Sequence, residues 1–171
     1  MRMSPRVRKL ALTAHVTSSV GWLGAVGAFL ALAITGLSSE DPNLVGSAYL
    51  AMELTGWFVI VPLSFAALVT GLIQAFGTEW GLLRHYWVIV KLVITILATI
   101  LLLVHMQPIT RMADAVEDRI LADSDLRRVR IQLVVDAAAA LAALLTATTL
   151  SIYKPRGLTR YGWRKRREEH S

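Results

Sequence analysis

Apolar residues fill four long stretches of the chain, separated by short polar segments. The stretches cover residues 10–37, 45–76, 86–106 and 131–153. About 20 apolar residues in a helix, at about 1.5 Å per residue, cross a hydrocarbon core about 30 Å thick, so each stretch can span a membrane. We therefore expect an all-α fold, an integral membrane bundle of four helices that forms a single domain over residues 1–171.

Prolines mark expected ends and bends of these helices. Pro42 lies in the polar turn after the first stretch. Pro62 lies inside the second stretch, where its ring clashes with the carbonyl of Phe58, so we expect a kink there. Pro108 is expected to end the third helix. The mixed-charge segment 109–129 carries apolar residues at helical spacing, which predicts a short amphipathic helix on the membrane surface.

Charge predicts the orientation of the bundle. The formal net charge is +6, and basic residues gather before the first stretch, around Arg84 and in the tail of residues 154–171. By the positive-inside rule these segments, and so both termini, are expected on the cytoplasmic side of the cell membrane. Because the basic clusters flank membrane helices, we expect contacts with anionic lipids at the tail and no nucleic-acid partner. The absence of cysteine excludes disulfides and thiolate metal sites.

Ionisable side chains inside the apolar stretches fall into two layers. His15 and Lys91 each lie about five residues from the cytoplasmic end of a helix, or about 7 Å deep. Glu53, His105 and Asp136 lie near the opposite ends of their helices. Such groups are costly in a membrane and usually face the bundle interior or mark a site. Structural roles stay open for each: an interfacial or snorkelling position, or a hydrogen bond between helices.

Helical periodicity predicts which faces turn inward. In the first helix, His15 shares a face with Ser18 and Trp22. The inward stripe of the second helix is expected to hold Glu53, Trp57, Ser64, Gly71 and Gln74. That of the fourth helix is expected to hold Gln132, Asp136, Ala140, Ala143 and Ala147. Small residues on such faces let helices approach closely or leave room for a ligand.

Haem is the cofactor that these residues favour. Neutral imidazole is a common axial ligand, and helix bundles hold cofactors between facing helices. His15 and His105 differ in depth by about 20 Å, so they cannot ligate one iron together. We expect His15 as axial ligand, with Lys91 as the opposite ligand or the partner of a propionate. The other layer, Glu53, His105 and Asp136, offers donors for a divalent metal or a proton relay.

Short motifs also give the chain a family resemblance. His15 is followed by Trp22-Leu23-Gly24, and Trp87 and Lys91-Leu92 open the third helix. With these residues the chain resembles a bacterial family of small four-helix membrane proteins of unknown function. It is more distantly similar to the HemJ-type protoporphyrinogen oxidases and, in its first helix, to the CopD membrane domain of copper resistance. The HemJ resemblance implies haem b binding by His15 and Lys91, and we place Trp22 at the same site.

Three functions remain open from the sequence. The first is a haem-binding membrane protein of redox or tetrapyrrole chemistry, working with a redox or membrane protein partner. The second is a cofactor-free module for ion, proton or metal transport that uses Glu53, His105 and Asp136. The third is a structural membrane subunit. The residues do not decide whether the protein is an enzyme.

Overall fold

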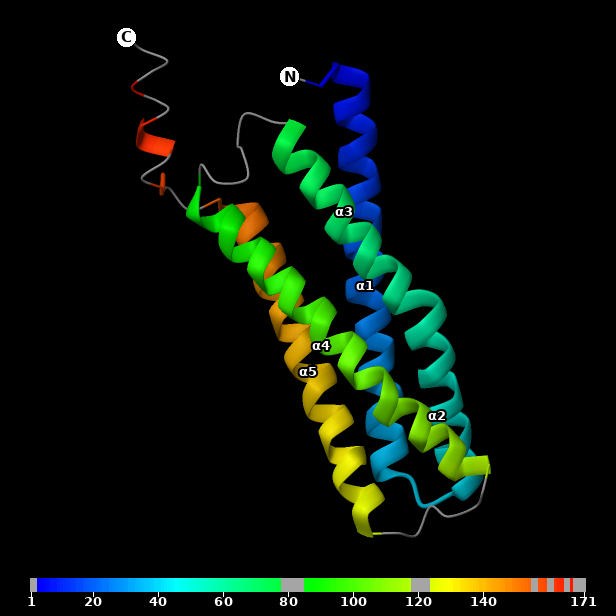
Figure 1. Ribbon diagram of the computed structural model, residues 1–171. Coiled ribbons are helices and arrows are strands. Elements are labelled where there is room, and N and C mark those ends of the chain that lie inside the picture. The colour runs from blue at the N-terminus through cyan, green and yellow to red at the C-terminus, as the bar shows by residue number, and fades with distance from the viewer. Residues whose placement is uncertain are drawn as a thin grey trace.

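The bundle is built from helices in nearly all of its described length. The computed structural model describes residues 3–77, 85–117, 124–154, 157–159, 162–164 and 167. The helices are α1 (Pro5–Ser38), α2 (Pro42–Thr55), α3 (Val61–Gly77), α4 (Tyr86–Glu117) and α5 (Ser124–Tyr153). A π-helical turn, η1 (Gly56–Ile60), joins α2 to α3, so that the two form one continuous rod. Four rods therefore run up and down the bundle (Figure 1).

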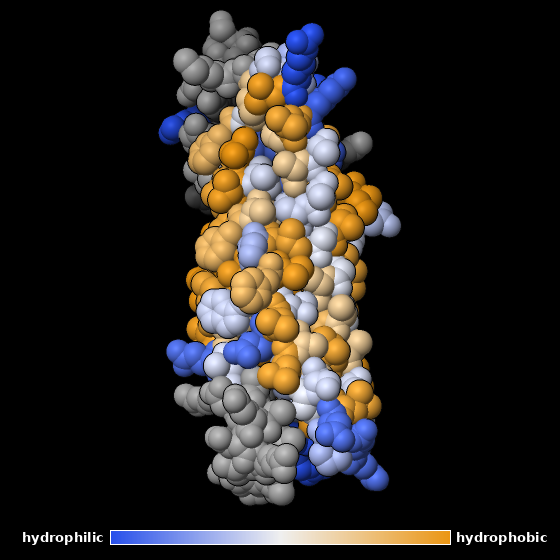
Figure 2. Space-filling view, turned by 90° about the vertical axis from the view of Figure 1, so that its right-hand side faces the viewer, coloured by the Kyte–Doolittle hydropathy of each residue, from blue (hydrophilic) through white to orange (hydrophobic). Residues whose placement is uncertain are grey.

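These rods are those of a multi-pass membrane protein. Within the described ranges, four helices are long and apolar enough to cross a membrane. Figure 2 shows apolar and neutral side chains over the middle of the molecule and hydrophilic ones toward both ends. The all-α, four-span prediction is thus confirmed, and the exposed apolar side chains, which are frequent on α4, are placed to contact lipid.

The two ends of the bundle are distinct. At one end, here called the terminal end, α1 begins and α5 finishes. At the other, the hairpin end, α1 turns into α2. Helices α1 and α4 lie diagonally across the bundle, because each packs against the rod of α2 and α3 and against α5. Side chains from α1 and α4 that face one another therefore meet in the bundle interior.

Local chemistry explains the first helix boundaries. The Ser4 side chain caps α1 by accepting a hydrogen bond from the Val7 backbone N–H, and Pro5 opens the helix. At the turn into α2, the Asp41 carboxylate accepts from the Asn43 N–H at 3.0 Å. Each cap satisfies an N–H that has no partner inside its own helix. The polar turn predicted from the sequence is therefore confirmed.

Helix α4 continues past the proline that was expected to end it. Pro108 lies inside the helix, which extends to Glu117. A proline removes its own N–H from the ladder and crowds the carbonyl four residues earlier, but burial of neighbouring side chains can offset this cost and hold a helix together across it. Met106 and Ile109, on either side of the proline, are almost completely buried. The prediction of a separate surface helix over residues 109–129 is wrong for residues 109–117, which continue α4. Residues 118–123 lie outside the described part, and the remainder belongs to α5.

The predicted distortion at Pro62 takes the form of a π turn. The Val61 N–H donates to the carbonyl of Gly56, five residues earlier, and Figure 1 shows the rod bending between α2 and α3. One additional residue in the turn widens the backbone just before the proline. A single-turn π segment is a known way to accommodate such an interruption.

The π turn also shifts the buried face of the rod. Its additional residue rotates the helical phase by about 100°. The predicted stripe is right after the turn, where Ser64 is fully buried, and wrong within it, where Trp57 is 46% exposed. The buried face before and within the turn contains Tyr49, Met52, Gly56 and Ile60. Glu53 lies one position off this face and is only partly buried.

Close packing concentrates toward the hairpin end. The largest completely buried side chains are Tyr49, Met52, Ile60, Met106, Ile109 and Leu133. Glycines allow two of these contacts. A Cβ built on Gly36 would lie 2.6 Å from Cζ of Tyr49, and one on Gly56 would lie 2.8 Å from Cε of Met106. Gly24 and Gly27, by contrast, have nothing within 4 Å of such a Cβ, so no close helix contact requires a glycine there.

Candidate functional site

The inward face of α1 carries His15 toward α3 at the terminal end. Nδ1 of His15 lies 3.1 Å from the Ala67 carbonyl oxygen and 3.1 Å from Oγ1 of Thr70. The ring also lies over Gly71, where a Cβ would come within 3.1 Å of its Cε1 atom. Glycine at this position therefore leaves the space that the imidazole occupies.

The hydrogen bonds of His15 define its tautomer, that is, which ring nitrogen carries the hydrogen. The Thr70 hydroxyl donates to a backbone carbonyl of its own helix, so its lone pairs are left to accept. The Ala67 carbonyl can only accept. Nδ1 of His15 must therefore carry the hydrogen, and Nε2 presents a lone pair. Nζ of Lys91 lies 3.3 Å from Nε2, in position to donate to it.

His15 and Lys91 reach each other from diagonal helices. Because α1 and α4 lie on opposite corners of the bundle, the His15–Lys91 contact crosses its interior. The prediction that these two residues share one layer is confirmed by their 3.3 Å separation. Both side chains are partly buried. The contact joins α1 to α4, and the Ala67 and Thr70 contacts join α1 to α3.

Other polar groups surround this contact. The Gln74 side chain donates to the Ala11 carbonyl at 3.1 Å, which ties α3 to α1 beyond His15. The Thr95 hydroxyl donates to the Lys91 carbonyl at 2.9 Å. On the other side of the site, Trp22 lies two helical turns from His15 on the same face of α1, and it belongs to the buried core. Polar groups therefore gather toward the terminal end and apolar packing begins at Trp22.

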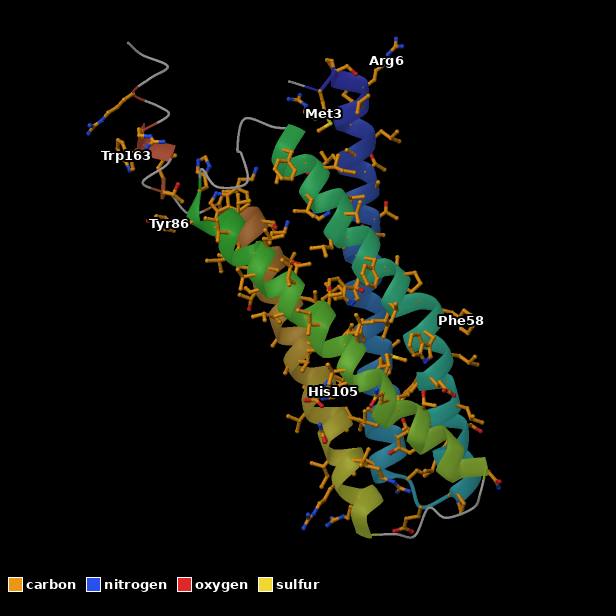
Figure 3. The ribbon with its side chains drawn as sticks, viewed as in Figure 1. Met3, Arg6, Phe58, Tyr86, His105 and Trp163 are labelled. Atoms are coloured by element: carbon orange, nitrogen blue, oxygen red, sulfur yellow. The ribbon has the colours of Figure 1, made fainter. Side chains whose placement is uncertain are left out.

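The second predicted layer is only partly brought together. Nε2 of His105 lies 2.7 Å from Oδ2 of Asp136, and Nε2 of Gln132 lies 3.2 Å from the same ring nitrogen. Figure 3 shows His105 on α4, where that helix passes α5. Glu53 does not join them: among the described residues no three His, Cys, Asp or Glu side chains form a group that could hold a metal ion. The phase shift at the π turn explains why this residue was misplaced.

Haem can be tested against the site near His15. A ligating histidine usually donates its other ring N–H to a carbonyl or carboxylate, which fixes the tautomer and orients the ring. His15 has this arrangement, so its donor chemistry fits an axial ligand. The direction of the Nε2 lone pair is occupied by the amine of Lys91. A haem iron at Nε2 thus requires the flexible lysine side chain to swing aside.

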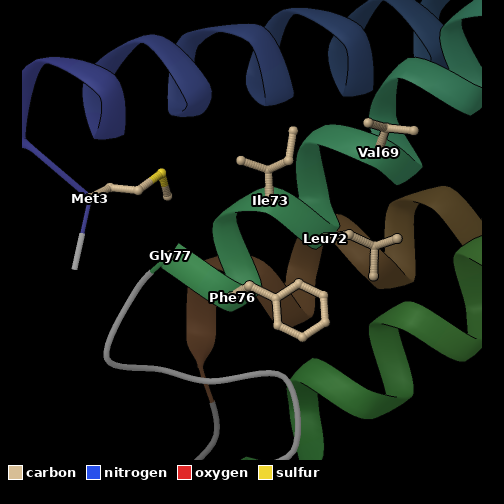
Figure 4. Close-up of a pocket in the computed structure, with 6 residues that line it drawn as sticks. All are labelled: Met3, Val69, Leu72, Ile73, Phe76 and Gly77. Carbon is tan, nitrogen blue, oxygen red and sulfur yellow. The ribbon is translucent and has the colours of Figure 1, made fainter. Parts of the chain in front are cut away.

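A separate hollow lies on the far face of α3. It has a volume of about 560 Å³ and is lined by Met3, Val69, Leu72, Ile73, Phe76 and Gly77. Figure 4 shows Met3 reaching toward the end of α3. Helical spacing places Val69, Leu72 and Phe76 opposite Thr70 and Gly71, so α3 itself separates the hollow from His15. Its apolar lining suits an acyl chain better than a charged group.

Two residues at these sites were missed as contacts by the sequence. Thr70 was not predicted, although it directly precedes Gly71 on the expected inward stripe. Gln132 was placed on the inward stripe of α5 without a partner. Neither contact has a spacing motif, because each joins residues from different helices.

No protein-family model, curated protein or solved structure matches the chain. The resemblances to HemJ-type proteins and to the CopD membrane domain therefore stay predictions.

Proposed function

We propose that the protein binds haem b in the membrane, with Nε2 of His15 as the axial ligand. The observation that carries this proposal is the anchored Nδ1–H of His15, held by the Ala67 carbonyl and the Thr70 hydroxyl. This arrangement leaves one nitrogen lone pair directed into the bundle interior, between helices that lie diagonally opposite. Helix bundles commonly hold cofactors in such a position.

The protein groups around the ligand have separate roles in this proposal. Thr70 and the Ala67 carbonyl keep the imidazole neutral and oriented. Lys91 would hold the group either as a second ligand or by pairing with a propionate. Trp22 closes the site toward the buried core. Bound haem b would supply one-electron redox chemistry, consistent with a protein of redox or tetrapyrrole metabolism.

The proposed setting is a bacterial cytoplasmic membrane, with the terminal end facing the cytoplasm. Exposed basic residues at that end support this orientation by the positive-inside rule. They include Arg6, Arg8, Lys9, Lys154, Arg164 and Arg167. Basic residues at a membrane surface attract anionic headgroups, and the apolar hollow on α3 lies at the same end.

Optical spectroscopy of the detergent-purified protein, reconstituted with haem b, tests the proposal. We expect a Soret band that is lost in His15→Ala and shifted in Lys91→Met. His85→Ala is the matched control, because His85 lies at the same end and is not part of the His15 contact network. Absence of a Soret band in the unmodified protein, or an unchanged band in His15→Ala, would contradict the proposal.

A further inference from the structure

Toward the hairpin end, the contact between α4 and α5 brings together three side chains that carry nitrogen or oxygen donors. We propose that His105, Asp136 and Gln132 form a binding site for one divalent first-row transition-metal ion, such as Zn²⁺. Gln132 and Asp136 are four residues apart on α5, so their side chains lie on one face, one turn apart. His105 completes the set from α4. The site lies about 21 Å along α4 from Lys91 and does not depend on haem.

One acceptor at this contact, Oδ2 of Asp136, is buried without a hydrogen bond among the described residues. Nδ1 of His105 lies 2.7 Å from the Leu101 carbonyl oxygen, which can only accept, so Nδ1 carries the hydrogen. In the neutral ring Nε2 then presents a lone pair, to which the Gln132 amide can donate at 3.2 Å, and this nitrogen lies 2.7 Å from Oδ2 of Asp136. Among the described residues, none donates a hydrogen bond to the buried Oδ2 of Asp136. A ring lone pair and a carboxylate oxygen 2.7 Å apart repel one another unless a cation, either a proton on the ring or a metal ion, lies between or beside them.

The spacing of the donors suits a metal ion. Nitrogen and oxygen ligands at about 2.0–2.2 Å from zinc lie about 2.8–3.6 Å from one another at angles between 90° and tetrahedral. The observed separations of 2.7 Å and 3.2 Å are close to this range. The two ends of a side-chain amide are interchangeable by rotation, so Gln132 can turn its oxygen toward the ion. The carbonyl of Leu101 orients His105 in the way that metal-ligating histidines are usually oriented.

Charge and access are also compatible with a cation. Asp136 supplies a negative charge, and the guanidinium of Arg130 on the same helix has its Cζ atom 5.8 Å from the centre of the Tyr49 ring. The side chains of His105 and Asp136 keep 15% and 26% of their surface exposed. His105 lies two residues from the end of the apolar span Tyr86–Gln107, so water can reach the site and complete the coordination shell.

The test uses the full chain in detergent after metal removal by a chelator. Calorimetric titration with ZnCl₂ should give one ion per chain, and CoCl₂ should give a visible ligand-field band. We expect His105→Ala and Asp136→Asn each to weaken the affinity for Zn²⁺ by at least about tenfold. Gln132→Leu, which removes the amide without removing charge, should weaken it less. Circular dichroism and size-exclusion profiles identify any variant that fails to fold, and the near-isosteric Asp136→Asn is then decisive.

Two controls separate this site from the others. Glu53→Gln removes a carboxylate at the same end and should leave Zn²⁺ affinity unchanged. His15→Ala removes the proposed haem ligand and should also leave the affinity for Zn²⁺ unchanged. The metal proposal can therefore fail while the haem proposal holds, and the reverse. Absence of stoichiometric binding to the unmodified protein would overturn the proposal in favour of a pair bridged only by a proton. Equal affinity in Asp136→Asn would overturn it as well.

Discussion

The two ends of the bundle differ in how they are packed. At the hairpin end, large side chains such as Tyr49, Met52 and Leu133 keep no more than 2% of their surface exposed. Toward the terminal end, the buried positions of the helices stop at Ser18 in α1, Ala67 in α3, Thr99 in α4 and Ala147 in α5. Beyond these positions the described residues of α1, α3, α4 and α5 are partly or fully exposed, and His15, Gln74 and Lys91 make polar contacts between helices.

This difference separates stability from adaptability. A well-packed interior tolerates little change in shape, whereas a region with few buried apolar contacts opens locally at low cost. The contact of His15 with Lys91 lies in the loosely packed part, where a long side chain can move to admit a ligand. The close packing beyond Trp22 holds the four helices in register while it does so.

Truncation of a core residue should have the largest effect. Leu133→Ala removes a side chain that is 2% exposed and should lower the free energy of unfolding by about 2–5 kcal/mol. Val93→Ala, on the exposed face of α4, should change it by no more than about 0.5 kcal/mol. Unfolding in mixed detergent micelles measures both. Equal losses would show that the two ends are equally packed.

Added volume at the hairpin end should come next. In Gly36→Ala the new methyl group meets the ring of Tyr49, which has no space to withdraw, so we expect a loss of about 1–3 kcal/mol. Gly24→Ala adds the same atom where nothing lies within 4 Å, and it should be neutral within about 0.5 kcal/mol. The pair of variants, measured by the same unfolding experiment, separates overpacking from any general effect of replacing a glycine.

Charge provides a further way to tell the ends apart. Arg6→Gln removes an exposed cation at the terminal end and should weaken the preference for anionic over zwitterionic lipid by about 1 kcal/mol. Native mass spectrometry of lipid adducts measures this preference. Arg127→Gln, at the hairpin end beside acidic residues, should have a smaller effect. A larger effect for Arg127→Gln would reverse the orientation proposed for the bundle.

The smallest stability effect is expected at the site itself. Lys91→Met keeps an unbranched side chain, one atom shorter, and removes a polar group from a loosely packed region, so we expect a change in unfolding free energy within about 1 kcal/mol. The same variant should still alter the absorption of bound haem. A loss well above 2 kcal/mol would show that the Lys91–His15 contact holds the terminal end together, and the contrast between the ends would then fail.

The four spans can be predicted from the sequence because hydropathy averaged over about twenty residues depends little on any single residue. The sequence also predicts the meeting of His15 and Lys91, since depth follows from counting residues inward from a helix end. The inward-facing positions predicted on α3, such as Ser64, are also correct, because the rotation per residue along that helix is regular. These inferences depend only on a regular rise and a regular rotation per residue.

The errors fall where that regularity is interrupted or overridden. One additional residue in η1 moved Glu53 off the buried face, and no residue type signals such a turn beyond the nearby Pro62. The continuation of α4 through Pro108 depends on the burial of Ile109, which is a tertiary contact. The partners of His15 on α3 depend on how closely two helices approach, and periodicity does not provide that distance.

The π turn has a consequence for sequence change in this rod. A deletion of one residue between Gly56 and Val61 would leave length and hydropathy almost untouched, so that any topology forecast would read the variant as normal. Yet it would swivel the whole of α2 about its axis relative to α3, turning Tyr49 toward lipid and bringing Glu53 inward. A one-residue deletion that leaves the hydropathy profile unchanged would therefore disrupt the packing of α2 in the bundle.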